Sequence, residues 1–226
     1  MPPGRQYLLR LVSSLWLIMS LAACSGLPEL PVTDESYQNW ARYQQQLHDI
    51  NSWEIHARAV IIVGKEVYQV GISWQREIDQ FVIVIEAPFG PGVFRLETNL
   101  QANGLPPIQL SMPDGQVLYD ESAEALLLQV LGWTIPVKEL RSWVKGLPLS
   151  DTEYSFELRA SGRLKSLRQQ GWEISYLDYF DEDTAAQGLP RKMYLKHQKL
   201  VLKIVIERWR QFESSVNSPL LFPDFN

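Results

Sequence analysis

The stretch SWEIHARAVIIVGKEVYQVGISWQ, residues 52–75, decides the fold. Its first half alternates apolar and polar residues, which places Trp53, Ile55, Ala57, Ala59 and Ile61 on one side of an extended chain. After the turn residues Gly64 and Lys65, the alternation resumes in a second half that carries Tyr68, Val70, Ile72 and Trp74. A period of two on both sides of a glycine-containing turn predicts an antiparallel hairpin with one apolar face.

Further strands are expected on both sides of this hairpin. A meander continues through residues 81–86 and 94–98, and Pro113-Asp114-Gly115 predicts a tight turn between short strands at 108–112 and 116–119. The later candidates are residues 154–158, 163–169, 172–180, 192–196 and 200–209. About eleven strands are therefore predicted, which makes the chain mainly β within the α+β class.

Three segments have the helical period instead. Residues 34–48 place Tyr37, Trp40, Ala41, Gln44 and Leu47 on one stripe, and Thr33 or Asp34 can cap the helix. Residues 121–131 and 136–147 are apolar over a broad face. Such faces must cover other apolar surface, so we expect the last two helices to lie over the sheet.

The N-terminus has the pattern of an export signal. Arg5 and Arg10 precede an apolar run at residues 11–23, which is shorter than the roughly 20 residues that a membrane span needs. The following Leu21-Ala22-Ala23-Cys24 resembles the lipobox of bacterial lipoproteins, in which the cysteine thiol takes up a diacylglyceryl group. The alternative is that Cys24 is an ordinary buried thiol. As the sole cysteine, it excludes an intrachain disulfide.

These patterns divide the chain into four parts. Residues 1–23 are the expected signal peptide, and residues 24–33 are a lipidated N-terminus followed by a proline-containing tether. Residues 34–209 form the folded domain. Residues 210–226 lose all periodicity, so we expect a loose tail there.

The charge balance limits the possible partners. Removal of residues 1–23 leaves 19 basic and 26 acidic side chains, a formal net charge of −7. An acidic chain without basic clusters argues against nucleic acid as a partner and against electrostatic binding to anionic lipid.

No residue pattern predicts an enzyme or a metal site. His48, His56 and His197 lack the spacing of metal ligands, and no nucleophile motif is present. The acidic stretch at residues 178–183 could be a calcium loop, but it lacks the required spacing and is better explained as a solvated loop. We therefore expect neither catalysis nor a cofactor.

Seven tryptophans follow the export signal, and two explanations remain open for them. They can fill a solid core, as buried aromatic residues usually do. Alternatively, a long sheet that curls around two apolar helices leaves a cavity, and these large side chains line it. The tryptophans are Trp40, Trp53, Trp74, Trp133, Trp143, Trp172 and Trp209.

The loop at residues 87–92 is unusual because prolines and glycines surround its aromatic residue. Pro88, Gly90, Pro91 and Gly92 bury little and favour turn geometry, so the ring of Phe89 can point into solvent. It can equally fold back onto the sheet edge. An exposed large aromatic side chain is costly unless it meets a membrane or a partner.

Several ordered motifs resemble one family, the outer-membrane lipoprotein receptor LolB. These are the lipobox followed by Ser25, Ile50-Asn51-Ser52-Trp53, Ser73-Trp74-Gln75, Ala87-Pro88-Phe89-Gly90, residues 132–137 (GWTIPV), residues 140–148 (LRSWVKGLP), Gly171-Trp172, Leu189-Pro190 and Leu202-Lys203-Ile204. Each motif is weak alone. The set runs in the family's order from about residue 24 to residue 209.

The resemblance implies both a fold and a function. The implied fold is an incomplete antiparallel β-barrel, similar to that of the periplasmic carrier LolA, with an N-terminal helix and lid helices over a hydrophobic cavity. The implied function is to accept acylated lipoproteins from LolA and to insert them into the inner leaflet of the outer membrane without nucleotide. Ser25 after the lipidated cysteine implies anchoring in the outer membrane, facing the periplasm, and we expect a monomer.

The resemblance and the alternation together predict site residues. In the family, the loop that matches residues 87–92 carries a protruding leucine that aids delivery to the membrane, and here Phe89 takes that place between Pro88 and Gly90. The acyl-chain cavity is predicted to be lined by strand residues Trp53, Ile55, Tyr68, Ile72, Trp74, Phe81, Ile83, Trp172 and Ile204 and by helix residues Leu127, Val130, Leu140 and Trp143.

Two other classes of function are open at this point. The chain could be a lipid-anchored assembly factor that binds a protein partner and encloses no lipid. It could also hydrolyse envelope lipids or peptidoglycan, but the missing catalytic constellation disfavours this reading.

Overall fold

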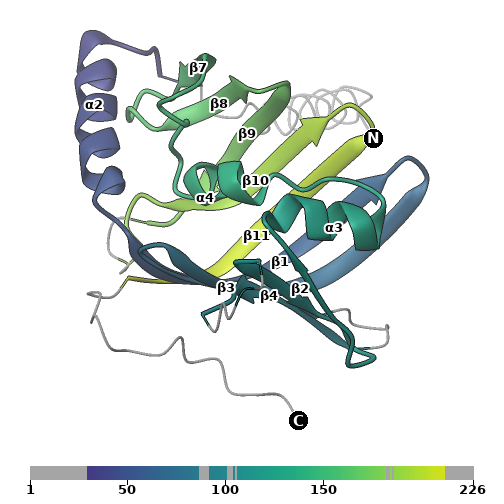
Figure 1. The fold of residues 1–226 in the computed structure, drawn as a ribbon. Coiled ribbons are helices and arrows are strands. Elements are labelled where there is room, and N and C mark those ends of the chain that lie inside the picture. Colours follow the sequence, from purple (N-terminus) through teal and green to yellow (C-terminus); the bar gives the residue numbers. More distant parts are fainter. Residues whose placement is uncertain are drawn as a thin grey trace, which may run out of the picture. The chain divides into compact units, whose positions relative to one another are not determined.

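The computed structural model describes residues 30–86, 92–100, 104, 106–181, 184 and 186–211. Within them, eleven antiparallel strands form one sheet and three helices accompany it (Figure 1). The strands are β1 (Ser52–Val63), β2 (Glu66–Glu77), β3 (Gln80–Glu86), β4 (Val93–Thr98), β5 (Ile108–Ser111), β6 (Val117–Asp120), β7 (Tyr154–Leu158), β8 (Leu164–Gln169), β9 (Trp172–Tyr179), β10 (Pro190–His197) and β11 (Leu200–Gln211). The predicted class and strand number are confirmed.

The sheet is not closed. Its strand order is β6-β5-β4-β3-β2-β1-β11-β10-β9-β8-β7, so all neighbouring strands in the sheet are also consecutive along the chain except for the β1–β11 pair. β6 and β7 each have a strand on one side only. The expectation of an incomplete barrel is therefore confirmed.

The three longest strands, β1, β2 and β11, form the centre of the sheet. The pairing register places inward-facing residues of adjacent strands side by side, because Trp74 of β2 lies between Ile55 of β1 and Ile83 of β3. Ile83 in turn pairs with Leu96 of β4. These side chains are at most 6% exposed, so they form one row on the inner face of the sheet.

Helices α3 (Ala123–Leu131) and α4 (Val137–Trp143) lie over the same inner face (Figure 1). Ser122 caps α3 by accepting a hydrogen bond from the Ala125 N–H, and Gly132 ends the helix in the left-handed conformation at φ 78°. The second helix is shorter than predicted. It ends at Trp143 because the chain turns at Gly146, which has a φ of 79°.

Helix α2 (Asp34–His48) has the predicted bounds but a narrower buried stripe. Ser36, Trp40 and Leu47 are buried, whereas Tyr37 is 56% exposed, contrary to its predicted place on the apolar face. The helix packs beside β7, where the rings of Trp40 and Phe156 are 5.8 Å apart. Gly162 allows this close approach, since a Cβ atom there would lie 2.6 Å from the Ser36 carbonyl oxygen.

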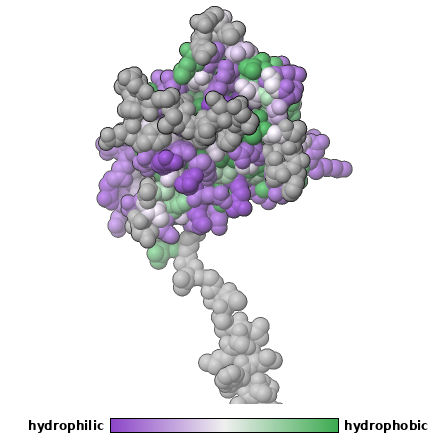
Figure 2. All heavy atoms as spheres, turned by 90° about the horizontal axis from the view of Figure 1, so that it is seen from below, coloured by the Kyte–Doolittle hydropathy of each residue, from purple (hydrophilic) through white to green (hydrophobic). Residues whose placement is uncertain are grey.

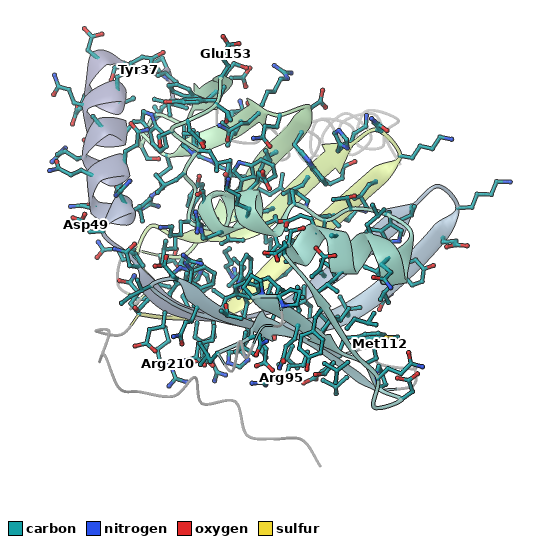
Figure 3. The ribbon with its side chains drawn as sticks, viewed as in Figure 1. Tyr37, Asp49, Arg95, Met112, Glu153 and Arg210 are labelled. Atoms are coloured by element: carbon teal, nitrogen blue, oxygen red, sulfur yellow. The ribbon has the colours of Figure 1, made fainter. Side chains whose placement is uncertain are left out.

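The opposite, outer face of the sheet carries charged side chains together with apolar ones such as Val60, Val82 and Val84. Arg95 and Arg210 lie on the side of the sheet away from α3 and α4 (Figure 3), and both take part in ion pairs with glutamates. Seen from below, the described surface is mostly hydrophilic, with hydrophobic residues in separate small areas (Figure 2).

The C-terminal boundary differs slightly from the prediction. Strand β11 continues to Gln211, because Glu54 and Trp53 of β1 pair with Arg210 and Gln211. Residues 212–226 lie outside the described residues, as do residues 1–29. In the part of the chain that is described, no helix is long and apolar enough to cross a membrane.

Candidate functional site

An apolar cavity lies between the inner face of the sheet and the two covering helices. Its volume is about 70 Å³, and all thirteen lining residues have apolar side chains. Strands contribute Ile55, Ala57, Ile72, Trp74, Ile83, Ile85, Leu96 and Ile204, and the helices and their connection contribute Leu127, Ile135, Val137, Leu140 and Val144. A ligand in this space would find no charge and would be held by apolar contact alone.

Seven of the thirteen predicted cavity residues lie in this lining. They are Ile55, Ile72, Trp74, Ile83, Leu127, Leu140 and Ile204. They come from β1, β2, β3, β11, α3 and α4, so the fold brings together positions up to about 150 residues apart in the chain.

The other six predicted residues lie elsewhere. Tyr68 has the inward phase, but it is 44% exposed because it sits at the far end of the β1–β2 hairpin, beyond the helices. Phe81 and Val130 are partly buried against the core. Three tryptophans are buried in packing instead: Trp53 against Trp74 and Trp209, and Trp143 against Trp172. The solid-core explanation therefore holds for these three.

Six lining residues were not predicted, although most of them continue a pattern that was visible. Ala57 and Ile85 are the next inward positions after Ile55 and Ile83. Val137 and Val144 lie three residues before and four residues after Leu140, on the same helical face. Leu96 follows from its pairing with Ile83, whereas Ile135 lies in the irregular connection and had no periodic signal.

The end of α4 is anchored by a buried polar cluster. Trp143 is fully buried; its Nε1 donates to Gln169 Oε1 at 3.0 Å, and its carbonyl accepts from the Tyr176 hydroxyl at 3.1 Å. Gln169 also accepts from the Leu149 N–H and donates to the Leu149 carbonyl. Burial raises the pKa of Tyr176 well above its ordinary value, so its hydroxyl stays protonated and keeps donating.

This combination of sheet, cavity and lid helices agrees with a family match over most of the domain. Residues 51–209 match the model of the family described as outer membrane lipoprotein LolB. The chain belongs to the LolB family.

Relatives match over nearly their whole length. The LolB protein of Nitrosococcus oceani is 34% identical over 202 residues, covering 89% of this chain and 97% of that protein. The LolB protein of Pseudomonas paraeruginosa is 32% identical over 205 residues, covering 89% and 96%. Both are named outer-membrane lipoproteins. A crystal structure of a LolA superfamily protein from Nitrosomonas europaea has a TM-score of 0.47 at 9% identity, covering 78% of this chain and 94% of that one.

A second anchor of α4 in this LolB domain is the buried lysine that follows it. Lys145 is 8% exposed, and its Nζ donates to the carbonyls of Leu47, at 3.3 Å, and Ile50, at 3.0 Å. It thereby joins the end of α4 to the segment between α2 and β1. Burial, followed by repulsion from Arg141 and Arg76, lowers the pKa of Lys145 to about 8.

This lowered pKa predicts a pH-dependent stability. Between pH 8 and pH 10.5 the unfolded chain keeps the Lys145 proton while the folded chain releases it, so stability should rise with pH across this window. Below about pH 8 both states are charged and the cost of burying the charge is fully present. Urea unfolding at several pH values should show this rise in the wild type, and Lys145→Met should flatten it.

Lys138→Met is the matched control, because this lysine is exposed on the same helix. It should keep the wild-type rise. An identical pH profile in wild type and Lys145→Met would contradict the assignment.

A hydrogen-bonded chain of Ser73, His56 and Glu54 lies on the outer face of this LolB domain. The Ser73 Oγ to His56 Nδ1 distance is 3.1 Å, and the His56 Nε2 to Glu54 Oε1 distance is 2.6 Å. Ser73 stands in a strand paired on both sides, so the sheet already uses the neighbouring backbone N–H groups. The backbone N–H groups beside Ser73 are therefore not available to bind an oxyanion, and we interpret the hydrogen bonds among Ser73, His56 and Glu54 as structural.

The remaining candidate residues fall into two groups. Cys24 and the loop residues Pro88, Phe89 and Gly90 lie outside the described residues. In the acidic stretch, Asp178 lies in β9 and forms ion pairs with Arg191 and Lys192 of β10, whereas Glu182 and Asp183 lie outside the described residues. Within the described ranges, no group of three His, Cys, Asp or Glu side chains is placed to hold a metal ion.

Proposed function

We propose that the chain is an outer-membrane lipoprotein receptor that accepts acylated lipoproteins from the carrier LolA and inserts them into the inner leaflet of the outer membrane, without nucleotide. The observation that carries this proposal is the wholly apolar cavity beneath two helices in a LolB family domain. Acyl chains are the cargo that such a lining suits, because each CH₂ moved out of water contributes about 0.8 kcal/mol.

The cavity must open to take up this cargo. Its volume of about 70 Å³ is less than half that of an engineered cavity of about 150 Å³ that binds benzene. An acyl chain is far longer than benzene. The described conformation is therefore too narrow for an acyl chain, and we infer that loading separates a covering helix from the sheet.

Helix α3 is the better candidate for this motion. The end of α4 is held by Trp143, Gln169 and Lys145. Helix α3 contributes Leu127 to the cavity, leaves Leu128 49% exposed, and is followed by Gly132 in the left-handed conformation. Loading that lifts α3 and leaves α4 in place would break the smaller number of described hydrogen bonds.

Anchoring and delivery involve the ends of the domain. Lipid on Cys24, after cleavage of residues 1–23, would hold the protein to the outer membrane facing the periplasm, with residues 24–33 as the tether. Phe89, flanked by Pro88 and Gly90, would enter the bilayer during delivery. A monomer suits a handover that needs an accessible cavity, and the reaction involves no catalysis or cofactor.

The handover can be measured with a soluble form that lacks residues 1–24. This form is mixed with LolA loaded with an acylated lipoprotein, and cargo that co-purifies with each protein is quantified. Movement of most of the cargo to this chain supports the receptor; about 1.4 kcal/mol of differential binding gives a tenfold bias. A stable complex with LolA and no movement of cargo would instead indicate an assembly factor.

The cavity itself is tested by Ala57→Leu. A larger side chain at this position fills the space of about 70 Å³, so cargo acceptance should fall at least about tenfold while the domain stays folded. The change in unfolding free energy should stay within about 1–3 kcal/mol, the usual cost of overpacking. Acceptance is measured as co-purified cargo and stability by urea unfolding.

Val60→Leu is the matched control on the outer face of the same strand. It should leave cargo acceptance unchanged. If Ala57→Leu accepts cargo as well as the wild type does, the acyl chains bind elsewhere.

A further inference from the structure

A second, cationic pocket of about 610 Å³ lies beside the apolar cavity. It is bounded by the C-terminal end of α2, the β2–β3 turn, α4 and the segment after α4. Four of its lining residues are cationic, namely Arg76, Lys138, Arg141 and Lys145, and two are acidic, namely Asp79 and Asp151. In a chain with a formal net charge of −5, this local excess of positive charge requires an explanation.

The pocket and the cavity are lined by neighbouring residues of the same elements, β2 and α4. Along β2, Trp74 lines the cavity, and Arg76, the next inward residue, lines the pocket. Two residues along a strand span roughly 6.6 Å. Helix α4 is divided in the same way, because Leu140 faces the cavity and its neighbour Arg141 faces the pocket. Apolar and cationic surfaces therefore meet at a common boundary.

Three of the cations in this pocket, Arg76, Arg141 and Lys145, form no ion pair with the described residues. Arg76 and Arg141 form no hydrogen bond or ion pair through their guanidinium groups within the described ranges, and Lys145 donates only to two neutral carbonyls. Asp79 is close enough to influence Arg76 but not to pair with it. Burial and then the charge of Arg141 lower the pKa of Arg76 to about 10. The fold therefore keeps Arg76, Arg141 and Lys145 close together although their positive charges repel one another.

The proposed acyl cargo does not account for this cluster, because a diacylglyceryl cysteine carries no phosphate and no negative charge. We propose that the cationic pocket binds a phosphate group, and that its ligand is an anionic phospholipid whose chains enter the adjoining apolar cavity. Two guanidinium groups and a lysine match phosphate oxygens in number and charge. Apolar side chains of Ile50, Ile78 and Leu147 also line the pocket and suit the glycerol part of a lipid.

The negative net charge of the chain argued against electrostatic binding to anionic lipid. The proposed phosphate site nevertheless agrees with the physics of such binding, because the charges that count are those near the ligand. Charges within a few ångströms of a partly buried ligand act through less water than the distant surface carboxylates do. The local positive charge of the pocket therefore outweighs the negative net charge of the whole chain.

The test uses the mature lipidated protein in a non-ionic detergent, without carrier or cargo. Isothermal titration calorimetry compares three probes: inorganic phosphate, glycerophosphoglycerol and dihexanoylphosphatidylglycerol. We expect all three to bind and the short-chain lipid to bind most tightly, because its chains alone can enter the apolar cavity when a covering helix moves. Since no handover is measured, failure of this proposal and failure of the receptor function are distinguishable.

Arg141→Gln should weaken binding of all three probes at least tenfold. Arg141→Lys keeps the charge but loses the planar guanidinium group, so it should weaken binding less. This variant replaces Arg141→Gln in the test if Arg141→Gln folds poorly. Arg58→Gln is the matched control, because this arginine pairs with Glu207 on the outer face. Melting curves check that each variant is folded.

Each outcome has a defined meaning. Binding of the lipid and the headgroup, lost in Arg141→Gln and kept in Arg58→Gln, supports the proposal. Tighter binding of inorganic phosphate than of the lipid overturns the lipid as the ligand. Absence of binding below about 10 mM, equal binding by Arg141→Gln, or binding of a hexaglutamate peptide in place of the phosphates overturns the phosphate site.

Discussion

Phe89→Glu should leave the transfer of cargo from LolA to this protein nearly unchanged and should slow insertion into membranes at least about tenfold. A phenylalanine side chain gains about 0.3–0.6 kcal/mol from the bilayer core, whereas a carboxylate costs about 2.5–3.5 kcal/mol at its centre. Even a shallow insertion would make the difference larger than the 1.4 kcal/mol that corresponds to tenfold. Transfer should survive because the residues of the sheet and of the covering helices that line the cavity are unchanged.

The assay needs both steps in one experiment. Cargo is first moved from LolA to the receptor in solution, and then liposomes are added and the cargo that floats with them is measured. Phe89→Leu, which keeps an apolar side chain, is the control and should insert cargo at the wild-type rate. Equal insertion by Phe89→Glu and wild type would remove this loop from the delivery step.

Gln169→Leu should be the most destabilising single substitution discussed. It leaves the indole N–H of Trp143 and both backbone groups of Leu149 without partners in the protein interior. Each unpaired buried group costs about 1–3 kcal/mol, so the free energy of unfolding should fall by about 3 kcal/mol or more. In a domain of this size the melting temperature should drop by roughly 6–12 °C.

The control for this substitution is Gln69→Leu, because Gln69 is exposed on β2. It should change the unfolding free energy by no more than about 0.5 kcal/mol. Thermal melting followed by circular dichroism gives both values. A drop of less than about 1 kcal/mol for Gln169→Leu would mean that water replaces the lost partners and that the cluster does not anchor α4.

The predicted sheet was correct because its signal is local. Alternation in residues 52–75 predicts which side chains point inward, and the structure keeps that phase from Trp53 to Trp74. The phase alone does not say how far along a strand the covering helices reach. Tyr68 has the right phase and is exposed for this reason.

Helix faces were predicted less well than strands. The apolar stripe of α2 included Tyr37, but the helix meets the sheet only along a narrow contact beside β7, and Ser36 takes the buried place instead. Ser36 is buried because its hydroxyl donates to the carbonyl of Ala160, a partner 124 residues away. No periodicity in the sequence can indicate such a partner.

Alternation and turn residues were enough to predict the strands, their antiparallel meander and the two covering helices, because these signals are properties of neighbouring residues. The open sheet followed from the resemblance of the ordered motifs to the LolB family. Three features came from the folded chain alone: which tryptophans are packed solid, how small the apolar cavity is, and that Arg76, Arg141 and Lys145 meet in one pocket. These features depend on contacts between β2, α4 and the end of α2, which are far apart along the chain. Burial and charge clustering are set by such long-range contacts, so they appear only when the chain is folded.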